Sequence, residues 1–162
     1  MGSKEDLGIA RNSSPLPLLR KDFFIDPYQV FETKYLGGDC ILIILSMLSD
    51  SQARELYQTA QENELDSIFE VHNENEFERA LSMNAKLIGV NNRNLHTFET
   101  DIGTTVNLAS KFSDKLIIIS ESGIYNSTQF KMLQQKNVNA FLVGESIIKS
   151  DNMTKAIQEL LD

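Results

Sequence analysis

Six short apolar runs recur along the chain, and their spacing restricts the fold more than any other feature. The runs lie at residues 16–19, 40–45, 67–71, 86–90, 115–120 and 140–144. Several are continuously apolar rather than alternating, as in "CILIIL", which is typical of strands buried on both faces of a parallel sheet. Gly, Asn, Asp or Ser bounds each run, as at the ends of strands. The pattern therefore predicts six parallel strands.

Segments with helical periodicity separate these runs. "DPYQVFETKYLGG" starts with Asp-Pro and ends in Gly, and "SDSQARELYQTAQEN" starts with Ser49 or Asp50 as a cap. A further helical segment, "SKEDLGIAR", precedes the first strand. The sequence pattern thus predicts a leading helix followed by about six strand–helix units, in one domain over residues 1–162. Such units form either an open doubly wound sheet or a closed barrel, and a barrel needs eight units and typically about 250 residues.

Composition excludes several classes of function. The net charge is −8 and the pI about 4.8, so no basic face is expected for nucleic acid. A local site can still bind a small anion. The single cysteine, Cys40, cannot form an internal disulfide and lies in an apolar run, so we interpret it as a core residue of a cytoplasmic protein. No apolar stretch is long enough to span a membrane, and we expect no membrane partner.

Polar residues and glycines, together with Phe23 and Met47, stand where the predicted strands end, which is where active sites form in parallel α/β folds. They are Lys21, Asp22 and Phe23, then Ser46 and Met47, Glu70 and His72, Asn91, Asn92 and Arg93, Glu121, Ser122 and Gly123, and finally Gly144, Glu145 and Ser146. A Lys acid and a Glu base on one rim suit proton transfer. The glycines of the last two units suit a phosphate held by backbone N–H groups.

Each residue also has a structural interpretation. A carboxylate inside an apolar strand is costly unless it is paired or functional, so we favour a function for Glu70. Lys21 could equally be a solvated strand end, and Asn91 and Asn92 resemble turn residues. We interpret His72 and His96 as surface or loop residues. No spacing of His, Cys or Asp indicates a metal site, and "SESGI" is not a nucleophile elbow.

Five segments together resemble one enzyme family. They are "LPLLRKDFFIDPYQVFE", "FEVHNENEFERAL", "LIGVNNRNLHTFETD", "SESGI" and "NAFLVGESI", in this order along nearly the whole chain. The chain is similar to indole-3-glycerol phosphate synthases of tryptophan biosynthesis. The resemblance implies a (β/α)8 TIM barrel and a carboxy-lyase. The reaction converts 1-(2-carboxyphenylamino)-1-deoxyribulose 5-phosphate to indole-3-glycerol phosphate, CO2 and water, without metal or organic cofactor.

The resemblance also implies roles for single residues. By their motifs, Lys21 resembles the general acid, Glu70 the base of the dehydration, and Asn91 the amide that orients the substrate. Phe23 resembles an aromatic wall of the substrate pocket, and Arg93 resembles a residue that orders the rim. Glu121 and Ser122 resemble contacts to the sugar chain. In the last two units, Gly123, Gly144 and the N–H of Glu145 resemble a backbone site for the phosphate.

The chain departs from the family pattern in one large respect. Two βα units and a "KxxSPS"-like motif with a second catalytic Lys are missing, so the chain resembles the C-terminal three-quarters of the barrel. We therefore expect an incomplete barrel with little or no synthase activity alone, and self-association through open sheet edges. The alternatives are a non-catalytic remnant or another phosphate-binding barrel, such as phosphoribosylanthranilate isomerase. The isomerase requires a Cys/Asp pair at the rim, whereas Cys40 stands at a strand start.

Overall fold

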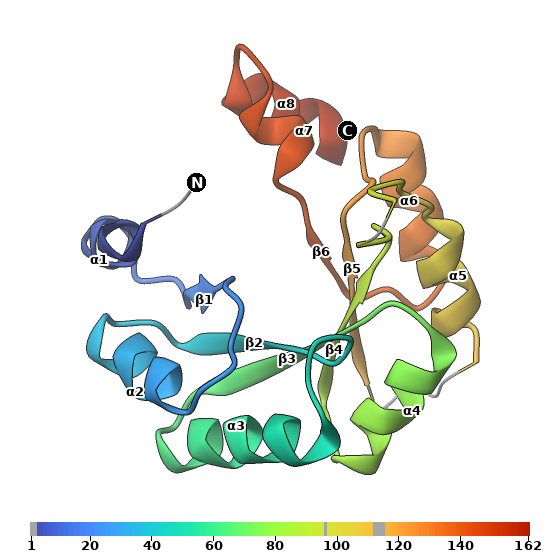
Figure 1. The fold of residues 1–162 in the computed structure, drawn as a ribbon. Helices are drawn as coiled ribbons and strands as arrows, with labels where there is room; N and C mark the ends of the chain where they lie inside the picture. Colours follow the sequence, from blue (N-terminus) through green and yellow to red (C-terminus); the bar gives the residue numbers. More distant parts are fainter. Residues whose placement is uncertain (1–2, 96, 112–115) are drawn as a thin grey trace. The chain divides into compact units, whose positions relative to one another are not determined.

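The computed structural model describes residues 3–95, 97–111 and 116–162, and strands and helices alternate along it until two helices follow the last strand (Figure 1). The strands are β1 (Leu19–Arg20), β2 (Cys40–Ile44), β3 (Asp66–Val71), β4 (Leu87–Asn91), β5 (Ile117–Glu121) and β6 (Ala140–Leu142). The helices are α1 (Lys4–Ser13), α2 (Tyr28–Tyr35), α3 (Asp50–Glu62), α4 (Glu74–Ser82), α5 (Gly103–Ala109), α6 (Ser127–Gln134), α7 (Glu145–Ile148) and α8 (Met153–Leu161). The predicted leading helix and alternation are confirmed.

The chain forms two compact units. The first comprises Met1–Glu70 and Arg79–Ala85, and the second comprises Val71–Glu78 and Lys86–Asp162. Each unit contains consecutive parallel strands joined by helices. The assignment of residues 1–162 to a single domain stays a prediction.

In the first unit, β1, β2 and β3 pair in parallel, with Ile44 opposite Glu70. In Figure 1, α2 and α3 lie along the same side of these strands. Tyr57 of α3 meets the Phe69 ring of β3 edge-on, with ring centroids 5.0 Å apart. Since side chains alternate along a strand, Glu70 points to the face of the sheet opposite α3.

In the second unit, β4, β5 and β6 pair in parallel, and α8 packs against both α6 and α7. The register aligns the polar ends of the strands: Asn91 is opposite Glu121, and Glu121 is opposite Leu142. The apolar residues Ile88 and Val90 of β4 are fully buried. Burial of each such side chain contributes about 1.5–3 kcal/mol to the stability of this sheet. The register of the strands then keeps their polar ends next to each other.

Capping residues set where several helices begin. Of the two predicted caps, Ser49 is the one that accepts a hydrogen bond from the Gln52 N–H, in a capping box at the start of α3. The side chains of Asn126 and Asn152 accept the N–H groups of Gln129 and Lys155 and so cap α6 and α8. Each cap is worth about 1 kcal/mol, so these asparagines position helices that would otherwise leave N–H groups unsatisfied.

The first strand differs from its prediction. We expected it at residues 16–19, but β1 is Leu19–Arg20, and the Leu16 side chain is 68% exposed. Pro15 and Pro17 lack the N–H that pairing with a neighbouring strand requires, so the strand begins only after them.

In the fifth predicted run, Lys115 lies outside the described residues. In the part of the chain that the structure describes, no helix has the length and apolar character needed to cross a membrane.

Candidate active site

Lys21 and Glu70 form an ion pair in the first unit. Lys21 Nζ donates to Glu70 Oε2 at 2.8 Å, although the two residues are 49 positions apart in sequence. The Glu70 side chain is 3% exposed, whereas that of Lys21 is 39% exposed. The pair thus combines a buried carboxylate with an ammonium that remains accessible to solvent. Such an arrangement can exchange protons with a bound molecule.

Arg20 anchors the backbone just before Lys21. Its buried guanidinium contacts Glu32 at 2.9 Å and Asp22 at 3.0 Å, and it lies 5.4 Å from the centre of the Phe24 ring. Two carboxylates and an aromatic face compensate for burial of this cation. Asp22 therefore fixes Arg20, and its other oxygen accepts the Phe23 N–H.

Phe23, the predicted aromatic wall, follows Lys21 directly. Its side chain is 59% exposed, and its carbonyl accepts a hydrogen bond from Gln29 of α2. The backbone of Phe23 is thus held while its ring faces solvent. Its proposed contact with a substrate stays a prediction.

In the second unit, the strand ends bring Asn91 and Glu121 together. Both side chains are buried, at 8% and 0% exposure, and the register of β4 and β5 places them opposite each other. Asn91 Oδ1 accepts the Arg93 N–H at 3.0 Å, so the amide also shapes the loop after β4. The Arg93 guanidinium donates to the carbonyl of Phe98 and contacts the Glu145 carboxylate.

The segment after β5 has an unusual backbone. Ser122 and Gly123 both have positive φ, at 63° and 73°. A Cβ at Gly123 would lie 3.1 Å from Cβ of Thr100, so a residue with a side chain would meet both strain and a close contact. The turn therefore requires glycine at position 123, which is buried just after β5 ends.

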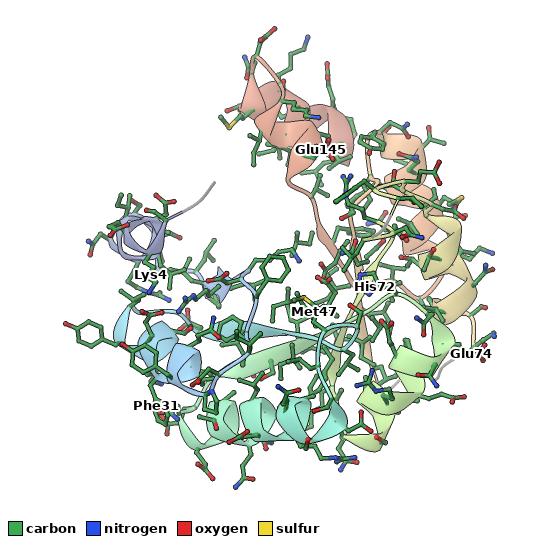
Figure 2. All side chains as sticks on the ribbon, viewed as in Figure 1. Lys4, Phe31, Met47, His72, Glu74 and Glu145 are labelled. Carbon is green, nitrogen blue, oxygen red and sulfur yellow. The ribbon has the colours of Figure 1, made fainter. Side chains whose placement is uncertain are left out.

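Gly144 and Glu145 stand at the start of α7, where Figure 2 labels Glu145. The Glu145 carboxylate contacts Lys149 at 2.6 Å and the Arg93 guanidinium, and these two cations hold its pKa below the ordinary value of 4.5. Ser146 Oγ donates to the carbonyl of Ile124, which joins α7 to the turn after β5. The structure thus brings together Arg93, the Gly123 turn and Glu145.

The sequence did not predict the structural roles of Arg20 and Asn92. Arg20 was absent from the predicted rim, and its only signal is a charged residue at the end of an apolar run. Asn92 was interpreted as a turn residue, yet it is 3% exposed and bonded to buried side chains. His72 lies in the predicted loop, half-buried against Glu76, whereas His96 is outside the described residues.

Cys40 is the first residue of β2, at the opposite end of the strand from the polar residues. Burial, together with the neighbouring carboxylate of Asp66, raises the pKa of this thiol to about 12. The thiol is therefore neither a nucleophile nor a base at neutral pH. This argues against the alternative of an isomerase that requires a Cys/Asp pair at the rim. Among the described residues, no group of three His, Cys, Asp or Glu could hold a metal ion.

Parallel βα units define a protein of the parallel α/β class, in which the carboxyl ends of the strands are the candidate site. The Lys21–Glu70 ion pair lies at these ends in the first unit, and the glycine turn at Gly123 lies at these ends in the second. The comparisons agree: the family model "Indole-3-glycerol phosphate synthase" matches residues 1–160, and the chain belongs to this family. Its fold is therefore that of an incomplete (β/α)8 barrel, with six strands in the described residues.

Curated relatives carry the same name. The indole-3-glycerol phosphate synthase of Legionella pneumophila (strain Lens) is 44% identical over 160 residues, which is 99% of this chain and 62% of the relative. That of Acinetobacter baumannii (strain AYE) is 46% identical over 160 residues, which is 98% of this chain and 60% of the relative. The chain thus spans about three-fifths of the length of these relatives.

Proposed function

We propose that this chain serves an indole-3-glycerol phosphate synthase reaction in tryptophan biosynthesis. The substrate would be 1-(2-carboxyphenylamino)-1-deoxyribulose 5-phosphate, and the products indole-3-glycerol phosphate, CO2 and water. The observation that carries the proposal is the contact between Lys21 and Glu70, at 2.8 Å, in a chain that belongs to this family. The relatives bear the name of this activity, which supports the assignment.

The pair suits the proton transfers of this reaction. Lys21 would act as the general acid that protonates the substrate carbonyl or the leaving hydroxyl, since its ammonium is partly exposed. Glu70 would act as the base of the dehydration, after Lys21 has given up its proton. Asn91 would orient the substrate, and Phe23 would line the pocket for its aromatic ring. A positioned acid or base contributes about 10²–10⁴-fold in rate.

The other proposed substrate contacts are residues of the second unit. Glu121 and Ser122 would contact the sugar chain, and the backbone around Gly123, Gly144 and Glu145 would bind the phosphate. The positive φ of Gly123 supports close approach of a ligand to the backbone. Arg93, held by Glu145 and the Phe98 carbonyl, would order this end and add a positive charge near an anionic ligand.

The proposals about partners and location rest on the net charge, the cysteine content and the exposed aromatic side chains. With a net charge of −8, we propose a small-molecule substrate and no nucleic acid, and we place the protein in the cytoplasm because one cysteine allows no internal disulfide. We also propose self-association. Tyr28, Phe31 and Tyr35 are spaced on one side of α2 and are 51–89% exposed, and Figure 2 shows Phe31 pointing outward. A monomeric mass in light scattering would contradict this.

The experiment uses turnover of the substrate, followed by the fluorescence of the indole product. We expect the 162-residue chain alone to show little turnover, since its sequence contains no "KxxSPS"-like motif. The assay therefore also uses a chimera that adds the part of the Legionella pneumophila enzyme that this chain does not match. In the chimera, Lys21→Met and Glu70→Gln are each expected to lower kcat about 10²-fold or more.

Lys34→Met is the matched control. Lys34 is a partly exposed lysine of α2 whose nearest acidic partner is Glu64, at 3.9 Å. Its replacement should leave kcat within about twofold of the starting chimera. The proposal is wrong if the chimera folds and turns over, yet Lys21→Met lowers kcat no more than Lys34→Met.

A further inference from the structure

The side-chain amide of Asn92 is fully used by four hydrogen bonds in the second unit. Asn92 Nδ2 donates to Ser120 Oγ at 3.1 Å and to the carbonyl of Ser122 at 3.0 Å. Asn92 Oδ1 accepts from the Thr105 N–H at 3.1 Å and from Thr105 Oγ at 2.8 Å. An amide offers two donors and two lone pairs, so each is matched. Asn92 is 3% exposed, so these bonds are made out of contact with water.

The backbone of Asn92 reaches the same segment. The Asn92 N–H donates to the Glu121 carbonyl at 2.9 Å, while the Asn92 carbonyl accepts the Asp101 N–H at 2.9 Å. Asn92 therefore holds two successive carbonyls where β5 ends, that of Glu121 through its backbone and that of Ser122 through its side chain. On its other side it is tied to Thr105 at the start of α5.

The turn that Asn92 contacts has an unfavourable backbone conformation. Ser122 has φ of 63° although it carries a side chain, and Gly123 follows at 73°. A non-glycine residue in this region costs of order 1–3 kcal/mol and persists only where neighbouring contacts determine it. The bond from Asn92 Nδ2 to the Ser122 carbonyl is such a contact, because it restrains the peptide between the two positive-φ residues.

We propose that Asn92 is a positioning residue for the Glu121–Gly123 turn. Its amide would hold the Ser122 carbonyl so that the Ser122 hydroxyl and the Gly123 backbone face a bound ligand with an anionic phosphate. Asn92 itself would not touch the ligand, because all polar atoms of its side chain are already bonded to other protein groups. The ligand part of this inference rests on the proposed function, whereas the conformational part rests on the hydrogen bonds alone.

Asn92→Asp separates this role from a general contribution to packing. The substitution keeps the size of the side chain and an oxygen for Thr105, but it places an acceptor against the Ser122 carbonyl. Ser120→Ala is the matched control, because it removes a buried partner of Asn92 and of Thr105 while leaving the bond to Ser122. Asn92→Ser is a second variant, since its shorter side chain carries no charge and does not span to Ser122.

The test compares backbone amide NMR spectra of the 162-residue chain and its variants, with urea unfolding as the measure of global stability. Asn92→Asp, or Asn92→Ser if the first does not fold, should shift and exchange-broaden the Ser122 and Gly123 amides. Ser120→Ala should leave these two amides in place, whatever stability it loses. Inorganic phosphate is then titrated, and its Kd should rise at least about fivefold for the Asn92 variant and less than about twofold for Ser120→Ala.

Two results would overturn the inference. One is an Asn92 variant whose Ser122 and Gly123 amides match those of the unsubstituted chain. The other is a Ser120→Ala variant that perturbs these amides as strongly, which would make the whole buried network responsible. If the unsubstituted chain binds no phosphate, the phosphate site of the proposed function fails, while the amide spectra still decide whether Asn92 positions the turn.

Discussion

Replacing Gly123 by alanine should destabilise the protein through two separate effects. The backbone at Gly123 has φ of 73°, where a residue with a Cβ costs about 1–2 kcal/mol. The added Cβ would also lie 3.1 Å from Cβ of Thr100 and 3.7 Å from that of Asn92. Thr100 pairs with Arg93 only through an isolated bridge, so the close contact should cost about 1 kcal/mol, at the low end for overpacking. The sum is about 2–3 kcal/mol.

Thermal unfolding measures this loss. For a chain of this size, about 2–4 °C of Tm corresponds to each kcal/mol, so Gly123→Ala should lower Tm by roughly 4–12 °C. Gly144→Ala is the control, because Gly144 has φ of −121° and its added Cβ would meet nothing within 4 Å. It should change stability by less than about 0.5 kcal/mol. Equal Tm values for the two variants would refute the reasoning from strain and contact.

Three further predictions concern other groups. Lys21→Met and Glu70→Gln should show a coupling of about 1–2 kcal/mol in a double-mutant cycle of urea unfolding, and a value near zero would mean that the pair contributes nothing. Burial alone would raise the pKa of Glu76, but hydrogen bonds from His72 and other donors lower it below 4.5. Its contribution to stability is therefore present above pH 4.5 and lost as the pH falls through the lowered pKa, and Glu76→Gln should flatten the pH dependence of unfolding there. At pH 8, native Cys40 should react with iodoacetamide about a thousandfold more slowly than a thiol of pKa 9.0, and reaction at the rate of the unfolded chain would contradict the raised pKa.

Local patterns were enough to predict the order of elements. Continuous apolar runs and capping residues such as Ser49 depend on neighbours close in sequence, and five of the six predicted strands overlap the observed ones along most of their length. The first strand was displaced because it is only two residues long and follows two prolines. So short a strand is determined by its pairing with Cys40 and Ile41 rather than by its own sequence.

The candidate site was predictable only in part. Glu70 stood out in the sequence because a carboxylate in an apolar strand is costly, and the structure shows it buried beside Lys21. The roles of Arg20 and Asn92 could not be read in the same way. Each depends on partners distant in sequence, such as Thr105, and single residues carry no sign of such partners.

The sequence alone determined the succession of βα units, the end of each strand at which polar residues gather, and the family, because these follow from periodicity and local motifs. Only the tertiary structure decided that Lys21 meets Glu70, that Arg20 is a buried cation between two carboxylates, and that Asn92 holds the turn at Ser122. The physical reason is that strand register and helix packing bring together groups far apart in the chain, and hydrogen bonds then form between whichever polar atoms are left facing each other.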